Sequence, residues 1–499
     1  MADYIPLAVA SLSVAALGVP FLQYFARRGN ASGYLVIAAV GVAFLAIAAN
    51  AASGSTSAYP FGSLLASDSL GNLFAMLTLG VALFVAVASL SLVPSSQTAN
   101  SPFYYSLLSF AALGMVLISY STDLLMLFIA WELMSIPTYA LAGFKKGSAA
   151  SNEAAVKYAI LGALSSATIL YAISLTYGLT GTLGIAAAAA SLGSHLSNPV
   201  AGIAILLFVV GFGFKMSIVP FHMWAPDAYE GAPTPIAALF AAGTKKAGFV
   251  AMIRVVLAIS TAVALTPGSG LFTLPNVLAV LALATMTLGN LAALTQKSMT
   301  RLLAYSSIAQ AGYILIGFVI YSYGQANPAF AQQAQLGMAG ALFHIINHSV
   351  MKGAAFLAAG LVILKLGSGS LDAFDGLGRR MPIAAFSLAM SFLALAGVPP
   401  LNGFWSKLML FTSVINTPYA WLAVAGVLNT ALSVGYYGWV IKRMYLDEPG
   451  GDQSPVEEPL TMALVLGVLV ALIVVFGLEP GPIISLAQHA VPALASLTG

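Results

Sequence analysis

The sequence predicts an all-α polytopic membrane protein of about fourteen transmembrane helices. Of its 499 residues, 60% are hydrophobic and only 7% are charged, and the mean hydropathy is +0.96. Soluble domains, in contrast, carry about 25% charged residues. Apolar runs of about 20 residues, the length that crosses a bilayer, recur along the whole chain. Basic residues collect in alternate loops between these runs. A soluble protein is therefore excluded, and a single helical bundle is predicted.

The spans follow the apolar runs in chain order. The first run, Tyr4 to Phe25, is preceded by Asp3 and followed by Arg27 and Arg28, which is the reverse of a secretory signal peptide. We therefore predict an uncleaved first helix. The predicted spans are 4–25, 33–52, 70–94, 103–120, 123–143, 154–181, 199–229, 233–262, 270–295, 302–323, 335–365, 381–412, 417–444 and 459–479.

Basic loop residues follow only the odd-numbered spans. The positive-inside rule then places the odd loops in the cytoplasm. Both termini are predicted on the outer side of a plasma or inner cell membrane, and one missed or invented span would have scrambled the pattern. The basic loop residues are Arg27, Arg28, Lys145, Lys146, Lys297, Arg301, Lys365, Arg379, Arg380, Lys442 and Arg443.

Proline and glycine interrupt two of the longest spans. Pro220 interrupts the seventh span within GFGFKMSIVPFHMW, and Pro399, Pro400 and Gly403 interrupt the twelfth within GVPPLNGFWSKL. A broken helix exposes backbone polar groups, which must be buried in protein or line a wet cavity. Paired breaks in two halves of a chain indicate an ion site in inverted-repeat transporters.

Charged residues inside the apolar runs are the main functional signal. Each costs roughly 2.5 to 3.5 kcal/mol at the centre of a membrane helix, so the set would cost on the order of 15 kcal/mol if unpaired. The side chains must therefore face one another or water. Adjacent residues project about 100° apart on a helix. Only one lysine of the pair at 245 and 246 is therefore predicted to face the other charged side chains inside the bundle. The charged residues are Glu132, Lys215, Lys245, Lys246, Lys352 and Lys407.

Two groupings among these residues predict proton transfer. Glu132 and Lys215 are the predicted pair, because a neighbouring carboxylate can hold a buried lysine near the point at which it releases a proton. His344, His348 and Lys352 lie at i, i+4 and i+8 in FHIINHSVMKGAAF and so share one helical face. Histidine titrates near neutral pH and can relay protons through its two nitrogens.

The relation of lysine to the helix break is reversed between the halves. Lys215 precedes its break and Lys407 follows its own, as an inverted repeat requires. Lone histidines in a core are more often structural, which is the interpretation for His195 and His222.

Other polar residues lie at the ends of the predicted helices or between them. Asp123 is predicted to cap a helix. Lys157 either snorkels to the surface or takes part in the relay. Asp227 and Glu230, at the external end of the seventh span, are expected to be exit-side or structural residues. The segment 447–458, DEPGGDQSPVEE, is predicted to be a solvated linker.

Cysteine is absent from the chain. No disulfide, iron–sulfur cluster or thiolate metal site can therefore be built from it. We predict no cofactor, metal or catalytic redox site in this chain, and no nucleic-acid partner. Redox chemistry must reside on partner subunits.

Long strings of the sequence resemble a known family. WELMSIPTYALAGF and FKMSIVPFHMWAPDAYEGAPTPIAALFAAGTKKAGF look closest to the N-type subunit of proton-pumping NADH:quinone oxidoreductase, respiratory complex I. QKSMTRLLAYSSIAQAGY and GVPPLNGFWSKL are shared more widely with antiporter-like subunits and Mrp-type antiporters. The resemblance covers about 70–445. The stripe of two histidines and a lysine looks more like that of the L-type and Mrp-type paralogues.

The resemblance implies a fold with two inverted five-helix repeats, each containing one broken helix. The repeats would occupy 103–262 and 270–444, between an N-terminal three-helix segment at 1–102 and an acidic loop with a C-terminal helix at 445–499. It also places the family's channel positions at Glu132, Lys215, Lys245 and Lys407.

The implied function is proton translocation by a non-redox subunit of a complex I type NADH, or other donor, quinone oxidoreductase. The donor, flavin, iron–sulfur clusters and quinone would belong to partner subunits, among them antiporter-like paralogues in the same bilayer. Protons would enter from the cytoplasm through the first half and leave through the second. The alternatives are a Mrp-type sodium/proton antiporter subunit, a membrane subunit of an energy-converting hydrogenase, and a structural anchor in which the buried charges would be dispensable.

Overall fold

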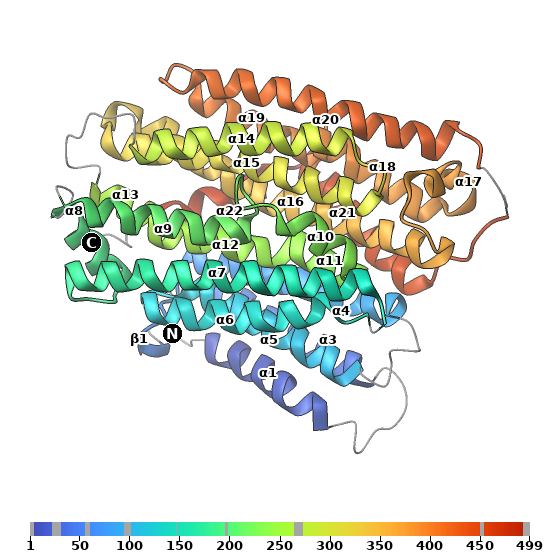
Figure 1. Cartoon of the computed structure of the whole chain (residues 1–499), viewed down its shortest axis with the longest axis horizontal. Helices are drawn as coiled ribbons and strands as arrows, with labels where there is room; N and C mark the ends of the chain where they lie inside the picture. The colour runs from blue at the N-terminus through green and yellow to red at the C-terminus, as the bar shows by residue number, and fades with distance from the viewer. Residues whose placement is uncertain are drawn as a thin grey trace.

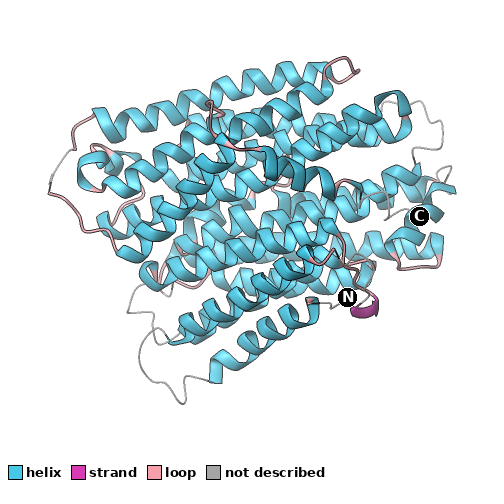
Figure 2. Cartoon of the chain, turned by 180° about the vertical axis from the view of Figure 1, so that it is seen from behind, coloured by secondary structure: helices cyan, strands magenta, loops and turns pink. Residues whose placement is uncertain are grey.

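The computed structural model of the chain describes residues 4–21, 31–54, 60–93, 101–145, 147–194, 198–263, 273–449 and 454–492. Within these ranges the chain is a bundle of helices with one short strand, β1 (Pro60–Ser63) (Figures 1 and 2). Twelve described helices are long and apolar enough to cross a membrane. The predicted class, an all-helical membrane protein, is confirmed at this level.

The helices run in the order of the predicted spans, with short additional helices between some of them. They are α1 (Ile5–Gly18), α3 (Ala31–Ala52), α4 (Ser69–Leu92), α5 (Ser101–Tyr120), α6 (Leu124–Ala142), α7 (Ala149–Thr180), α8 (Ile185–Ser194), α9 (Pro199–Met216), α10 (Trp224–Gly231), α11 (Thr234–Leu239), α12 (Lys245–Met252), α13 (Ala258–Val263), α14 (Leu274–Leu294), α15 (Met299–Ala326), α16 (Ala331–Leu366), α17 (Leu377–Arg380), α18 (Pro382–Ala396), α19 (Asn402–Val414), α20 (Ala420–Leu446), α21 (Leu460–Leu478) and α22 (Gly481–Ala490).

Both predicted breaks are present. Pro220 lies between α9 and α10, and Pro399 and Pro400 lie between α18 and α19. Each break begins with a residue in the left-handed conformation, Ser217 (φ 53°) after α9 and Gly397 (φ 84°) after α18. A left-handed residue at this position ends an α-helix by turning the chain out of its path.

Gly403 corrects the prediction in detail. It lies in the first turn of α19 and not in the break. A Cβ atom at this position would lie 1.9 Å from the carbonyl oxygen of Ala394. Glycine is therefore needed because the two half-helices approach each other closely at this point.

The centre of the bundle holds α15, α16 and the helical stretch 234–263. That stretch combines α11, α12 and α13 with two π-helical turns, η3 (Phe240–Thr244) and η4 (Ile253–Leu257). Its most apolar window is completely buried, and the corresponding window of α15 is 94% buried. In Figure 1, α11, α12, α15 and α16 lie between α20 on one side and α1 on the other, whereas α13 lies at one end of the bundle. Polar groups on the enclosed helices must find partners inside the protein.

Hydrogen bonds place the two ends of the described chain on one face, here called the terminal face. The amide of Tyr4, just before α1, donates to Asn50 Oδ1 at the end of α3 (3.4 Å). Asn50 in turn bonds Ser67, which precedes α4. Ser69, at the start of α4, bonds the carbonyl of His489 in α22. In Figure 1 the start of α1 lies at one end of the bundle and α17 at the other.

The predicted basic loops lie together on the opposite face, here called the basic face. The amide of Leu371 bonds the carbonyl of Lys297 (2.9 Å), and the amide of Gly376 bonds the carbonyl of Arg443 (3.0 Å). Arg443 also forms ion pairs with Asp372 and Asp375. Arg27, Arg28 and Lys146 lie outside the described residues.

Asp227 and Glu230 belong to the basic face, so their predicted place at the external end of the seventh span is wrong. Asp227 pairs with Lys157 (2.6 Å) and Arg301 (2.7 Å), and Glu230 also pairs with Arg301 (3.2 Å). The reason is topological, because the seventh span runs toward the same face as the other odd-numbered spans. Lys157 has 44% of its side chain exposed and also pairs with Glu153, so the structure favours the snorkelling interpretation.

Candidate functional site

The charged and histidine side chains predicted inside the bundle are half-buried or buried, and we call them the lane. Burying a charge without compensating partners is costly, so the partners of each group define what it can do. Glu132 is half-buried. The others are at most 3% exposed: Lys215, Lys245, Lys246, His344, His348, Lys352 and Lys407.

Lys215, in the last turn of α9, is held by hydroxyl groups. Its Nζ donates to Tyr158 Oη in α7 (2.8 Å) and to Ser135 Oγ in α6 (3.2 Å). It also lies 5.0 Å from the ring centroid of Tyr158 and 5.6 Å from that of Tyr139. These contacts offset desolvation while leaving the lysine without a direct carboxylate partner.

The predicted pair of Glu132 and Lys215 is not a direct contact. Glu132 accepts a hydrogen bond from Ser166 in α7, whereas Lys215 bonds Ser135 and a tyrosine. The hydroxyl of Tyr139 faces both Ser135 and Ser166. A chain of hydroxyls therefore separates the carboxylate from the ammonium, and hydroxyls can both donate and accept.

The lysine pair on α12 departs from the prediction that only one of them enters the lane. Lys245 Nζ donates to the carbonyl and the Oγ of Ser307 in α15, both at 3.1 Å. Lys246 Nζ bonds His348 Nδ1 in α16. Because α12 is enclosed on every side, two side chains that project in different directions both meet polar partners. The 100° separation of adjacent residues does hold, but it does not keep either lysine away from buried polar groups.

The stripe on α16 occupies one helical face, as predicted, and its members contact different helices. Lys352 Nζ donates to the carbonyl of Leu303 in α15 (3.0 Å) and to Ser306 Oγ. The ring centroids of His344 and His348 are 6.3 Å apart. The stripe is therefore a row of separate contacts and not a direct chain of hydrogen bonds.

His344 bridges two neighbouring helices. Its Nδ1 lies 2.9 Å from Ser406 Oγ in α19, and its Nε2 lies 3.0 Å from Gln310 Oε1 in α15. The other end of Gln310 donates to the carbonyl of Leu395 (3.1 Å). That carbonyl also accepts from Lys407, so His344 and Lys407 belong to one hydrogen-bonded network.

Lys407 uses the break of the twelfth span as its binding site. Its Nζ donates to the carbonyls of Leu395 (2.8 Å) and Ala396 (3.3 Å) at the end of α18, and lies 4.7 Å from the ring centroid of Tyr313. The last carbonyls of a helix have no intrahelical partner and carry partial negative charge. The break therefore supplies the groups that stabilise a buried cation.

Two consecutive serines on α15 bond lysines from the two halves of the bundle, and sequence reasoning missed them. Ser307 holds Lys245 of the eighth span, while Ser306 holds Lys352 of the eleventh and also accepts from Tyr437 Oη (2.8 Å). The available signal was a polar pair inside an apolar helix, in LLAYSSIAQAGY. Serine is neutral, so an argument from the cost of burying charge does not select it.

Residues 121–433 match the family described as NADH:quinone oxidoreductase/Mrp antiporter, transmembrane. The chain belongs to this family. It is 42% identical over 443 residues to the F(420)H(2) dehydrogenase subunit N of Methanosarcina mazei, covering 87% of this chain and 86% of that protein. It is 40% identical to the NADH-quinone oxidoreductase subunit N of Desulfitobacterium hafniense, covering 86% and 85%. The predicted resemblance to N-type subunits is confirmed.

Three solved structures share the fold. A chain of the archaeal membrane-bound sulfane sulfur reductase superposes with a TM-score of 0.86 at 28% identity, covering 100% of this chain and 98% of that one. A chain of respiratory complex I from Thermus thermophilus gives 0.79 at 30% identity, covering 96% and 99%. A chain of the Mrp complex from a Dietzia species gives 0.83 at 20% identity, covering 99% of each, which shows the fold alone.

One buried charge in this family member was not predicted. Arg254, in η4, is completely buried and donates through Nη2 to both carboxylate oxygens of Asp68 (2.9 Å each) and through Nε to the carbonyl of Ser119 (2.7 Å). Asp68 also caps α4 by accepting from the amide of Gly71 (2.6 Å). The pair therefore ties together the ends of three elements near the terminal face and is structural.

Three further polar residues had been singled out in the sequence: Asp123, His222 and His195. Asp123 caps α6, as predicted, by accepting from the amides of Leu125 and Met126 (2.9 and 3.0 Å). His222 lies in the break after α9 and is 8% exposed. His195 lies outside the described residues.

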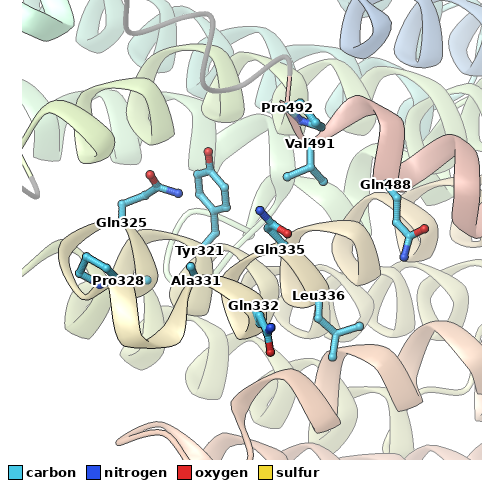
Figure 3. A pocket seen from close by; sticks show the side chains of 11 residues that line it. Tyr321, Gln325, Pro328, Ala331, Gln332, Gln335, Leu336, Gln488, Val491 and Pro492 are labelled. Carbon is cyan, nitrogen blue, oxygen red and sulfur yellow. The ribbon is translucent and has the colours of Figure 1, made fainter.

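Within the described part of the chain, cavities open on both the terminal face and the basic face. One, of about 720 Å³ near the terminal face, is lined by neutral side chains such as Tyr321, Gln325, Gln335 and Gln488 (Figure 3). The other, of about 170 Å³, is on the basic face and contains Lys145 and other polar groups. Only the second cavity has charged side chains in its lining.

Proposed function

We propose that this chain is the N-type proton-translocating subunit of a complex I type redox pump and has no redox chemistry of its own. The observation that carries the proposal is the lane. Buried lysines and histidines run through both halves of the bundle, and most of them bond hydroxyl, amide or imidazole groups, whereas Lys407 bonds backbone carbonyls. A structural anchor has no need for such a set, since each buried charge costs several kcal/mol to insert.

The first half of the lane is where the protein would sense its partners. A charge movement near Glu132 would change the hydrogen bond that Ser166 donates to it, and through the neighbouring hydroxyls of Tyr139 and Ser135 the position of the Lys215 proton. Such a chain transmits a change in charge without contact between the carboxylate and the ammonium. Moving one charge against 100 mV requires roughly 2.3 kcal/mol, so the energy must come from redox partners.

The second half of the lane would carry the proton onward. From Lys245 the serine pair leads to Lys352, and the histidines of α16 lead to Gln310 and Lys407. The breaks at α9/α10 and α18/α19 support two inverted five-helix repeats at 103–262 and 270–444. The basic loops support fourteen spans with both termini outside.

The relatives suggest the class of partner. The Methanosarcina relative is named as a subunit of an F(420)H(2) dehydrogenase and the Desulfitobacterium relative as a subunit of an NADH-quinone oxidoreductase. We propose that this chain assembles with antiporter-like paralogues and with a soluble arm that oxidises a hydride donor. The flavin, iron–sulfur clusters and quinone would belong to those partners.

The test is proton pumping by the purified complex that contains this chain, reconstituted in vesicles. Lys215→Ala should abolish or uncouple quinone-dependent pumping while the complex still assembles. Lys442→Ala, which alters a lysine with 56% of its side chain exposed on the basic face, should pump at the wild-type rate. Pumping that needs no redox partner and follows a sodium gradient would replace the proposal with the Mrp-type antiporter alternative.

A further inference from the structure

The small cavity on the basic face lies between the two halves of the bundle. Its polar lining includes Lys145, Glu230, Ser298 and Thr300, and Tyr229 also lines it. A water molecule occupies about 30 Å³ in the liquid, so a cavity of about 170 Å³ can hold several. Burial lowers the pKa of the Lys145 ammonium, which lines this cavity.

Tyr229 connects this cavity to the interior. Its side chain is 1% exposed, and its ring packs edge-on against Trp224 (5.9 Å) and Phe356 (5.5 Å). Its hydroxyl faces Ser217 and Ser307. Aromatic packing fixes the direction of the ring, so the hydroxyl is held in place.

The hydroxyl of Tyr229 is buried and makes no direct hydrogen bond within the described part of the chain, and the same is true of Ser217 Oγ. Leaving a buried polar group unsatisfied costs about 1 to 3 kcal/mol. Hydroxyls that face one another without bonding directly are the usual surroundings of a bridging water molecule. Ser307, the third hydroxyl of this group, already accepts from Lys245 (3.1 Å).

We infer that the cavity on the basic face is the proton inlet of the lane, and that Tyr229 passes protons to Lys245 through a water site shared with Ser217 and Ser307. The inference rests on the proposed function and locates its inlet. A hydronium ion in the cavity gives its extra proton to the phenol oxygen and becomes neutral water, as the phenol gives its own proton to the bridging water and that water gives one to Lys245. One proton then reaches the neutral amine of Lys245, so no net charge stays on the tyrosine.

The first experiment removes the hydroxyl and keeps the ring. Tyr229→Phe should lower quinone-driven pumping about tenfold, whereas Tyr104→Phe should leave it unchanged. Tyr104 is a matched control because it is completely buried and its hydroxyl bonds Ser89, outside the lane. Pumping by Tyr229→Phe at the wild-type rate would overturn the inferred route.

The second experiment does not depend on Tyr229 and exploits the absence of cysteine from the chain. Ser298→Cys places one thiol in the cavity, and Leu446→Cys places one at an exposed position, 76% accessible, at the end of α20 on the same face. A membrane-impermeant thiol reagent applied from the basic side should stop pumping in the first variant only, relative to the parent complex treated identically.

The two proposals fail in different ways. Pumping that persists in labelled Ser298→Cys, while Lys215→Ala does not pump, would overturn the inlet alone. Full pumping by Lys215→Ala would overturn the proposed function itself.

Discussion

Ser306 and Ser307 of α15 lie between the two halves of the lane, and replacing each of them by alanine in turn allows the two variants to be compared with each other. Ser307→Ala removes one side-chain acceptor from Lys245 and leaves the carbonyl acceptor at 3.1 Å. Ser306→Ala removes the side-chain acceptor of Lys352 and also that of Tyr437. The substitutions are chemically identical and adjacent, so the number of direct hydrogen bonds that each one breaks is the main difference apart from the water site inferred beside Ser307.

The expected magnitudes follow from those contacts. A hydrogen bond to a charged group is worth about 1.5 to 3 kcal/mol and a neutral one about 1 kcal/mol. At the low end, Ser307→Ala loses about 1.5 kcal/mol and Ser306→Ala about 2.5 kcal/mol. Since about 1.4 kcal/mol is tenfold, pumping should fall about tenfold in the first variant and about 60-fold in the second.

The assay is the initial rate of quinone-driven proton transport in vesicles, divided by the rate of donor oxidation. Ser109→Ala is the control, because Ser109 is completely buried and bonds only the carbonyl of Tyr105 in its own helix. Equal rates for the two junction variants, or a larger loss for Ser307→Ala, would refute the reasoning from contacts.

The other predictions concern the framework and the second lysine of α12. Asp68→Ala should destabilise the complex by about 3 to 5 kcal/mol because it leaves the fully buried guanidinium of Arg254 without its carboxylate partner. Adding Arg254→Met should restore most of the lost stability. Thermal unfolding in detergent measures both effects, and a double variant no more stable than Asp68→Ala would contradict the prediction. Gly403→Ala should destabilise by about 1 to 3 kcal/mol in the same assay and reduce pumping. Gly438→Ala, with open space around its Cβ, should do neither. Lys246→Met should lower pumping as well, since this lysine contacts the histidine stripe; a wild-type rate would show that the contact is structural.

Features that depend on a single helix were predictable from the sequence, whereas contacts between side chains of different helices were not. The alignment of His344, His348 and Lys352 follows from helical periodicity, and the capping role of Asp123 from its place before an apolar run. Glu132 and Lys215 were expected to form a pair, yet each bonds hydroxyl groups and the two do not bond each other. Which groups lie between two charges depends on how three helices are rotated about their axes, and that rotation is set by packing.

The sequence by itself determined the helical class, the positions of the apolar helices, both breaks and the burial of the charges, because run length, proline chemistry and the cost of a charge in hydrocarbon are properties of short segments. Only the tertiary structure decided which side chains contact one another. Arg254 meets Asp68 across 186 positions of chain, and both Lys245 and Lys246 find polar neighbours because α12 is enclosed. Ser306 gains its role only where two lysine-bearing helices converge on α15. Such contacts arise from close packing between distant segments, which no local pattern encodes.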